Sequence, residues 1–88
     1  MEWDQRKARE NERKHGVRFT DVEPVFYDPH AMTIEDRSSL EEQRFLTLGI
    51  DGFAKALVVT YTFRGERIRI ISARKASPGE VRAYEERT

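Results

Sequence analysis

Hydrophobic and polar positions alternate most regularly between Lys55 and Lys75, where two runs rich in β-branched and aromatic residues are separated by Arg64 and Gly65. A two-residue break containing glycine between such runs predicts a β-hairpin. With Arg64 and Gly65 as the loop, the alternation of side chains sorts the hairpin into two faces. The face predicted to join the core carries Leu57, Val59, Tyr61, Phe63, Ile68 and Ile70, and it ends in Ser72 and Arg74. The other face carries Ala56, Val58, Thr60, Thr62, Arg67, Arg69, Ile71 and Ala73.

The alternation continues upstream of the hairpin. Residues Arg44 to Asp51 read RFLTLGID, and Asp51-Gly52 is a turn signal that leads back into the hairpin. A two- or four-residue loop at this turn places Leu46, Leu48 and Ile50 on the predicted core face. Ala31 to Asp36 is expected to form a short edge strand, and residues 37 to 42 a polar turn or loop.

Helices are predicted on both sides of this meander. Asp4 to His15 contains good helix formers and stops before Gly16, a common helix terminator. This segment is so highly charged that Trp3 is expected to anchor it. The capping-box pattern Thr20-Asp21-Val22-Glu23 predicts a second short helix from about Asp21, ending at Asp28-Pro29. A further capping box, Ser77-Pro78-Gly79-Glu80, predicts a short C-terminal helix.

The order of these elements predicts an α+β fold, in which N-terminal helices pack on an antiparallel β-meander of three to four strands and a short C-terminal helix follows. A chain of 88 residues has too little material for a second core, so residues 1–88 are expected to form one domain. The 16 Lys and Arg residues balance 16 Asp and Glu residues, so the protein as a whole has no long-range attraction for nucleic acid. The charged residues are nevertheless unevenly distributed, because the hairpin is mainly basic and residues 28–42 are mainly acidic.

Composition also bears on the compartment and on the classes of site. The chain contains no cysteine, which suits a reducing compartment, and it has neither a signal-peptide pattern nor an apolar run of the roughly 20 residues that span a bilayer. We therefore expect a cytoplasmic protein that does not associate with membranes. His15 and His30 lie in different segments without metal-ligand spacing, and phosphate-binding and dinucleotide motifs are absent from the sequence. No metal and no cofactor are expected.

An arginine-rich sheet with a few proton carriers fits the cleavage of RNA without metal. This reaction needs a base for the ribose 2′-hydroxyl, cations for the charge that develops on phosphorus, and an acid for the leaving 5′-oxygen. Guanidinium groups suit the second role, because their planar fork matches two phosphate oxygens. The candidate cations are Arg67 and Arg69, two residues apart on one strand, and Arg74 and Lys75 at its end. The candidate proton carriers are His15, Glu42 and Tyr61.

Each candidate also has a purely structural interpretation. The arginines fit solvated or cross-strand-paired residues, and His15 fits a cation at a helix C-terminus. Tyr61 fits a core residue whose hydroxyl lies at the edge, and Glu42 and Arg44 fit residues that pair with their neighbours. The spacing alone leaves these alternatives open.

Several separated motifs in the same order resemble the BrnT family of type II toxins along nearly the whole chain. They are Trp3-Asp4 with Lys7 and Asn11, Lys14-His15-Gly16-Val17 with Phe19, Val25-Phe26 with Asp28-Pro29, Glu42 with Arg44, Val59 with Tyr61-Thr62, and the run from Arg69 to Ala76 followed by Glu80 and Tyr84. Departures from the family pattern are small, such as Glu2 at a place where a large apolar residue is common.

The resemblance implies a RelE-like ribonuclease toxin that cuts RNA, blocks translation and arrests growth. A BrnA-like antitoxin would neutralise it in a hetero-oligomeric complex, and that complex would contact promoter DNA only through the antitoxin. The residues to which the resemblance gives importance are His15, Glu42, Arg44, Tyr61, Arg69 and Arg74. With them we expect Lys7, Lys14, Arg67 and Lys75 to bind RNA. The competing hypothesis is a non-catalytic binding module whose arginine face docks an acidic partner.

Overall fold

The computed structural model describes residues 1–87, which form an α+β fold around one five-stranded sheet. The strands are β1 (Glu2–Trp3), β2 (Met32–Asp36), β3 (Arg44–Ile50), β4 (Ala56–Arg64) and β5 (Arg67–Lys75). The helices are α1 (Gln5–His15), the 3₁₀ helices η1 (Phe19–Asp21) and η2 (Glu23–Tyr27), and α2 (Pro78–Arg87). The predicted fold class is confirmed, with an antiparallel meander of four strands, β2 to β5.

The fifth strand, β1, was not predicted. It runs parallel to β5, with Glu2 opposite Arg69 and Trp3 opposite Ile70, so the strand order is β1-β5-β4-β3-β2. Two residues are too few for a pattern of alternation, and only the tertiary structure shows that they pair. Trp3 packs edge-on against Phe19, with ring centroids 6.0 Å apart. The expected anchoring of the first helix by Trp3 therefore occurs through a strand.

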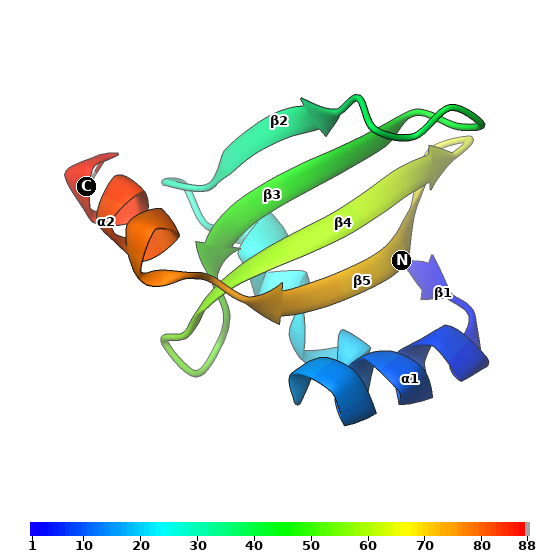
Figure 1. Ribbon diagram of the computed structural model, residues 1–88, viewed down its shortest axis with the longest axis horizontal. Helices are drawn as coiled ribbons and strands as arrows, with labels where there is room; N and C mark the ends of the chain where they lie inside the picture. The colour runs from blue at the N-terminus through cyan, green and yellow to red at the C-terminus, as the bar shows by residue number, and fades with distance from the viewer. Residues whose placement is uncertain (88) are drawn as a thin grey trace.

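The predicted N-terminal helix is confirmed within one residue. Asp4 is its N-cap, and Oδ1 of Asp4 accepts hydrogen bonds from the backbone N–H groups of Arg6 and Lys7 at 2.8 and 3.3 Å. Gly16 ends the helix in the left-handed conformation, with φ of 70°. Figure 1 shows α1 running beside β5, along the edge of the sheet that β1 leaves open.

The predicted second helix is wrong in type. No side chain caps η1 or η2, and the segment forms two 3₁₀ turns in place of one α-helix. A 3₁₀ helix has three residues per turn, so residues three apart lie on one face. Phe19, Val22 and Val25 have this spacing, and all three are buried against the sheet. Packing thus favours the three-residue repeat, and Pro24, which lacks an N–H, fits this segment.

The hairpin between β4 and β5 is confirmed, but its loop is one residue further along than predicted. Arg64 pairs with Arg67, so Gly65 and Glu66 form the turn. Gly65 has φ of 62°, which the first loop position of a two-residue hairpin requires and which glycine adopts at no steric cost. The predicted apolar face near the loop remains correct, because Phe63 faces Ile68 and Tyr61 faces Ile70.

A β-bulge in β5 changes the faces beyond that point. Tyr61 pairs with Ile70, whereas Thr60 pairs with Ser72, so Ile71 is the extra residue. The predicted end of the core face in Ser72 and Arg74 is therefore wrong. Ala73 takes the core position beside Val59 and is fully buried.

The predicted core positions of β3 are also wrong. Phe45, Thr47 and Gly49 face the core, and Leu46, Leu48 and Ile50 face the other side. The loop after β3 is the cause: Asp51 N–H binds the carbonyl of Lys55 at 2.9 Å, which leaves the three residues 52–54 in the loop. An odd loop reverses the faces that a two- or four-residue loop would give. Gly49 is required at its position, because a Cβ there would lie 2.9 Å from Cγ1 of Val25.

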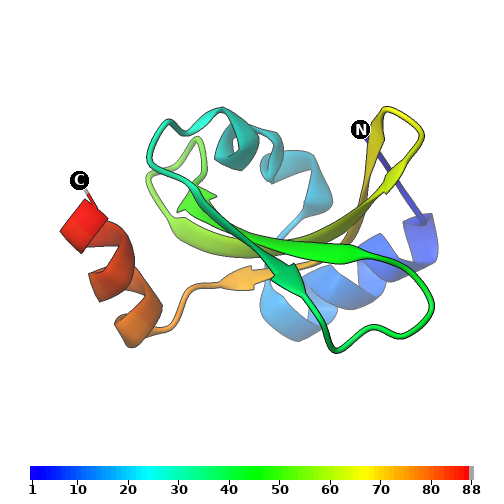
Figure 2. The same cartoon turned by 90° about the horizontal axis from the view of Figure 1, so that it is seen from above.

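The core lies between the sheet and the 3₁₀ helices. Its buried members are Val17, Phe19, Val22, Val25, Leu57, Val59, Tyr61, Ile70 and Ala73. Figure 2 shows η1 and η2 on one side of the sheet, with α2 and the loop after β2 toward the other.

The C-terminal helix begins with the predicted capping box: Ser77 N–H binds Glu80 Oε1 at 2.7 Å, and Glu80 N–H binds Ser77 Oγ at 3.2 Å. Within residues 1–87, no helix has the length and apolar character needed to cross a bilayer.

Candidate active site

A row of polar side chains crosses the uncovered face of the sheet near the β4–β5 hairpin. Thr62 of β4 pairs with Arg69 of β5, and Arg69 pairs with Glu2 of β1. Continuing the β3–β4 register by one residue places Arg44 opposite Thr62. Arg44 and Arg69 therefore flank Thr62 on one face, with backbones about 10 Å apart across two strand spacings. The two arginines therefore belong to one row of side chains that runs across β3, β4 and β5.

The β-bulge brings the end of β5 onto this same face. Ser72 pairs with Thr60 and Arg74 pairs with Val58, so both lie on the side of Arg69. Without the extra residue Ile71, Arg69 and Arg74 would point to opposite faces, as the sequence predicted. The bulge thus gathers Arg69, Ser72 and Arg74 on one surface. We call Arg44, Arg67, Arg69 and Arg74 the arginine face.

Three of these arginines are held by carboxylates. Arg69 Nη1 donates to Glu2 Oε2 at 2.8 Å, and Arg44 Nε donates to Glu42 Oε1 at 3.2 Å. Arg74 forms a fork with Glu80, in which Nη1 and Nη2 donate to the two carboxylate oxygens at 2.8 and 2.9 Å. A guanidinium has five N–H donors, so each arginine keeps donors for a phosphate. The pairs orient side chains that would otherwise be mobile.

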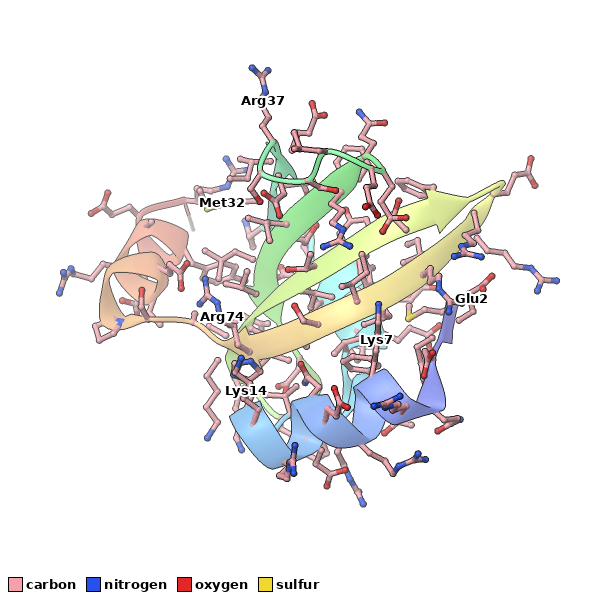
Figure 3. The ribbon with its side chains drawn as sticks, turned by 45° about the vertical axis from the view of Figure 1, so that its right-hand side comes forward. Glu2, Lys7, Lys14, Met32, Arg37 and Arg74 are labelled. Atoms are coloured by element: carbon pink, nitrogen blue, oxygen red, sulfur yellow. The ribbon has the colours of Figure 1, made fainter. Side chains whose placement is uncertain are left out.

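A groove of about 250 Å³ between α1 and β5 adjoins the arginine face. Lys7, Lys14 and His15 line it from the helix, together with Glu10 and Asn11, and Ile71 and Ser72 line it from the strand. Figure 3 shows Lys7 and Lys14 extending from α1 toward β5. Three of the predicted residues, far from β5 in the sequence, are therefore brought to the same strand as Arg69 and Arg74.

Asn11 holds α1 at this position. Its side chain is buried, and Nδ2 donates to the carbonyls of Val17 and Ala73 at 2.9 and 2.8 Å. Oδ1 of Asn11 accepts from the N–H of Ala73 at 3.0 Å. Ala73 follows the bulge on the part of β5 that β1 does not cover. Asn11 thus substitutes for a neighbouring strand and sets the distance between Lys7, Lys14 and the strand.

Two predicted site residues do not lie with the others. Tyr61 is in the core, where its ring meets Phe26 edge-on at 4.9 Å and its hydroxyl lies 2.9 Å from Thr47 Oγ1. Lys75 pairs with Leu57 on the core side of the sheet and lines a different pocket with Asp51 and Phe53. The remaining eight residues, His15, Glu42, Arg44, Arg69, Arg74, Lys7, Lys14 and Arg67, lie on the arginine face, beside it, or in the adjoining groove.

Asp28 ties α2 to the sheet. Its Oδ2 accepts from Tyr84 Oη at 2.6 Å and from Ile50 N–H at 2.9 Å, and its Oδ1 accepts from His30 N–H. Desolvation raises the pKa of Asp28, but these hydrogen bonds lower it more, so the net pKa lies below its usual value. The hydrogen bond to Asp28 raises the pKa of Tyr84 to about 12. Glu80 adds a second tie, and its hydrogen bonds with Arg74 and with the N–H of Ser77 lower its pKa from 4.5 to about 2.

These shifts predict that acid loosens α2. A carboxylate whose pKa is lower in the folded state stabilises the fold above its unfolded pKa, and this contribution disappears as the pH falls toward the folded pKa. For Glu80 the loss runs from about pH 4.5 down to about pH 2. We expect amide hydrogen exchange in α2 to accelerate over this range before the sheet unfolds. The variant Glu80→Gln should show faster exchange already at pH 7 and a smaller change with pH; an identical pH profile would contradict the assignment.

Metal-binding side chains do not cluster in the described part of the chain. Among residues 1–87, no group of three or more His, Asp or Glu side chains is arranged to hold a metal ion. His15 lines the groove between α1 and β5, and His30 belongs to the turn that Asp28 stabilises. The chemistry available at the arginine face comes from guanidinium, ammonium, carboxylate and imidazole groups.

Comparison with known proteins identifies the family. The family model for the ribonuclease toxin BrnT of type II toxin–antitoxin systems matches residues 3–80. The chain belongs to the BrnT family. Its fold is similar to that of the Brucella abortus ribonuclease toxin BrnT, whose crystal structure was determined at 1.1 Å resolution, with a TM-score of 0.71 and 26% sequence identity over 88% of this chain and 97% of that one. No curated protein sequence matches the chain.

Some contacts of this candidate site were not predicted from the sequence. No sequence pattern identifies Glu2 and Glu80 as partners of arginines, or Ser72 as a groove residue. Each has its role through a contact that only the folded structure makes. For Asn11 a signal existed: it shares a helix face with Lys7 and Lys14, four and three residues away. Its short, uncharged amide distinguishes Asn11 from the two lysines on that face, but its burial is visible only in the structure.

Proposed function

We propose that this BrnT-family toxin is a metal-independent endoribonuclease, and that RNA lies over the arginine face and along the α1–β5 groove. The observation that carries the proposal is the arrangement of Arg44, Arg69 and Arg74 on one face of the sheet. The family, which is described as a ribonuclease toxin, provides the class of reaction, cleavage of RNA. The proposal is supported by the placement of eight of the ten predicted residues on the arginine face, beside it, or in the adjoining groove.

The proposed reaction is transfer of the phosphodiester from the 5′-oxygen to the neighbouring 2′-oxygen. A base removes the 2′-hydroxyl proton, the 2′-oxygen bonds to phosphorus, and the bond to the 5′-oxygen breaks as an acid protonates it. The proposed roles are that Arg69 and Arg74 hold the scissile phosphate and that Arg44 or Arg67 offsets the charge that grows on its oxygens. Arg69 and Arg74 pair with β4 residues four positions apart, Thr62 and Val58, so RNA would have to draw their side chains together from Glu2 and Glu80. Glu42 or His15 would transfer the protons. The Glu42 carboxylate is already at Arg44, 3.2 Å from its Nε.

Lys7 and Lys14 would contact the phosphates that flank the cleaved one. They lie two helical turns apart along α1, and both line the groove between α1 and β5. Ammonium groups bind phosphates mainly by charge, so this contribution should weaken steeply with salt. Binding would be insensitive to base sequence at these two positions.

In the cell, the toxin would act in the cytoplasm by cutting RNA, and the resulting block of translation would arrest growth. A BrnA-like antitoxin would neutralise it, and the complex would contact promoter DNA through the antitoxin. The near-zero net charge of the chain supports this division of roles, because a protein that binds DNA itself usually carries a basic surface overall.

The decisive experiment is to induce the chain alone and together with the protein encoded by the neighbouring open reading frame. We expect growth arrest and RNA fragmentation in the first culture and neither in the second. Purified toxin should cut RNA in the presence of EDTA, since no step requires a metal. A purified chain that cuts no RNA at low salt, yet binds the neighbouring protein tightly, would instead support a non-catalytic module that docks an acidic partner.

A further inference from the structure

The register of β3 leaves an apolar strip on the face opposite the 3₁₀ helices, at the edge of the sheet away from α1, where Met32, Leu46 and Leu48 are half-buried. Met32 of β2 pairs with Leu48 of β3, and Ile34 pairs with Leu46, so these four side chains share one face. Ile34 is 63% exposed, and Leu40 in the loop after β2 is 98% exposed. We call the four strand residues Met32, Ile34, Leu46 and Leu48 the β2 strip; Leu40 follows in the loop. Figure 3 shows Met32 on the opposite edge from Lys7 and Lys14.

The edge beside this strip is open to another strand. β2 is the last strand of the sheet and has a strand neighbour on one side only. Natural edge strands are commonly protected by charged side chains, especially lysine, by proline, by a bulge or by being very short. β2 reads MTIED, contains neither lysine nor proline, and pairs with β3 without a break in register, and its two charged residues, Glu35 and Asp36, stand together at one end. Its backbone is therefore suited to accept a sixth strand.

The charge around β2 indicates which partner would fit. Glu35 and Asp36 end the strand, and Glu41 and Glu42 follow in the loop, against one arginine, Arg37, in the same stretch. The acidic rim contrasts with the basic arginine face. A partner segment with apolar side chains at alternate positions and basic side chains between or after them matches both the strip and the rim.

We propose that an extended segment of the antitoxin, apolar at alternate positions and basic elsewhere, pairs with β2 as a sixth strand and covers Ile34 and Leu40. The proposal rests on the proposed function in one respect, that the partner is an antitoxin. Main-chain hydrogen bonds along Met32–Asp36 would give affinity, and the apolar strip and acidic rim would give selectivity. RNA is disfavoured here, because its phosphates would meet the acidic rim.

Docking at this edge would also reach the arginine face. The last residue of β2, Asp36, pairs with Arg44, which begins the polar row leading to Arg69. A segment that extends past Asp36 would run beside the loop of residues 37–43, in which Glu42 pairs with Arg44. Antitoxin and RNA would compete for that end of the row, although the strip itself lies outside it.

The test compares Ile34→Asp with Phe53→Asp. Phe53 is exposed to a similar extent, 69%, but lies in the loop between β3 and β4. Titration calorimetry with the purified protein from the neighbouring open reading frame should show Ile34→Asp binding at least about 30-fold more weakly than wild type, the loss expected of a central interface residue, and Phe53→Asp binding unchanged. RNA cleavage by Ile34→Asp without antitoxin should match wild type, and the antitoxin should fail to suppress its growth arrest.

Hydrogen exchange distinguishes pairing of an antitoxin strand with β2 from other modes of antitoxin binding. In the complex, alternate amides of residues 32–36 that exchange rapidly in the free toxin should become protected. The proposal would be overturned if Ile34→Asp bound the antitoxin as tightly as wild type, or if protection were confined to other elements. It would also be overturned by apolar contacts without new amide protection, which a helix packed on the face would give. Light scattering that shows the free wild-type toxin as a dimer and free Ile34→Asp as a monomer would overturn it too, because a second copy would then occupy β2. The binding result stands even if the wild-type chain cuts no RNA.

Discussion

Replacing Asn11 by alanine is expected to lower the free energy of unfolding by about 3 kcal/mol, because it leaves a buried N–H and two carbonyls without partners. That loss is a large share of the roughly 5–15 kcal/mol that stabilises a small domain. The melting temperature should fall by about 10 °C or more. Urea denaturation followed by the fluorescence of Trp3, the single tryptophan, would measure the change.

Two further variants make this prediction specific. Asn11→Asp keeps the shape but replaces two N–H donors by a carboxylate that faces two carbonyls, so it should destabilise at least as much as alanine. The control Arg13→Ala, on an exposed part of the same helix, should change stability by less than about 0.5 kcal/mol. If Asn11→Ala unfolds at the same urea concentration as Arg13→Ala, the assigned hydrogen bonds do not stabilise the fold.

Replacing Arg69 by alanine is expected to lower the rate of RNA cleavage by about 100-fold or more, because one charged donor to the developing negative charge is lost. The fold should persist, because Arg69 pairs with Glu2 at a partly exposed position. Single-turnover cleavage of a labelled RNA by purified protein would measure the effect, and growth after induction would report it in cells. Arg69→Lys should recover only part of the rate, because an ammonium group cannot bind two phosphate oxygens as a fork.

The control for Arg69 must separate a role in the reaction from one in holding β1. Glu2→Gln weakens the same ion pair and leaves the guanidinium in place, so it should retain far more activity than Arg69→Ala. Exposed Arg13→Ala tests the loss of a positive charge elsewhere. Wild-type cleavage by Arg69→Ala would remove Arg69 from the site, and equal losses in Arg69→Ala and Glu2→Gln would make it a positioning residue.

Local sequence patterns were sufficient to predict much of the fold. Asp4 and Gly16 define the ends of α1 through their own hydrogen bonds and backbone angles, and the Ser77–Glu80 capping box starts α2 in the same way. Such signals act between residues a few positions apart, so they can be read before the fold is known. The same holds for the apolar alternation of β4 and the first half of β5. The errors begin where a single residue in a loop or bulge reverses the faces of a strand.

The sequence by itself therefore determined the class of fold, the approximate limits of α1, α2 and the four strands of the meander, and an inventory of arginines suited to phosphate chemistry, but neither β1 nor the type of η1 and η2. The tertiary structure alone decided which arginines share a surface. The extra residue Ile71 turns Arg74 to the side of Arg69, and the three-residue loop 52–54 turns Leu46 and Leu48 away from the core. The physical reason is the two-residue period of a strand, since a shift by one position exchanges its faces, and long-range packing decides where that shift occurs.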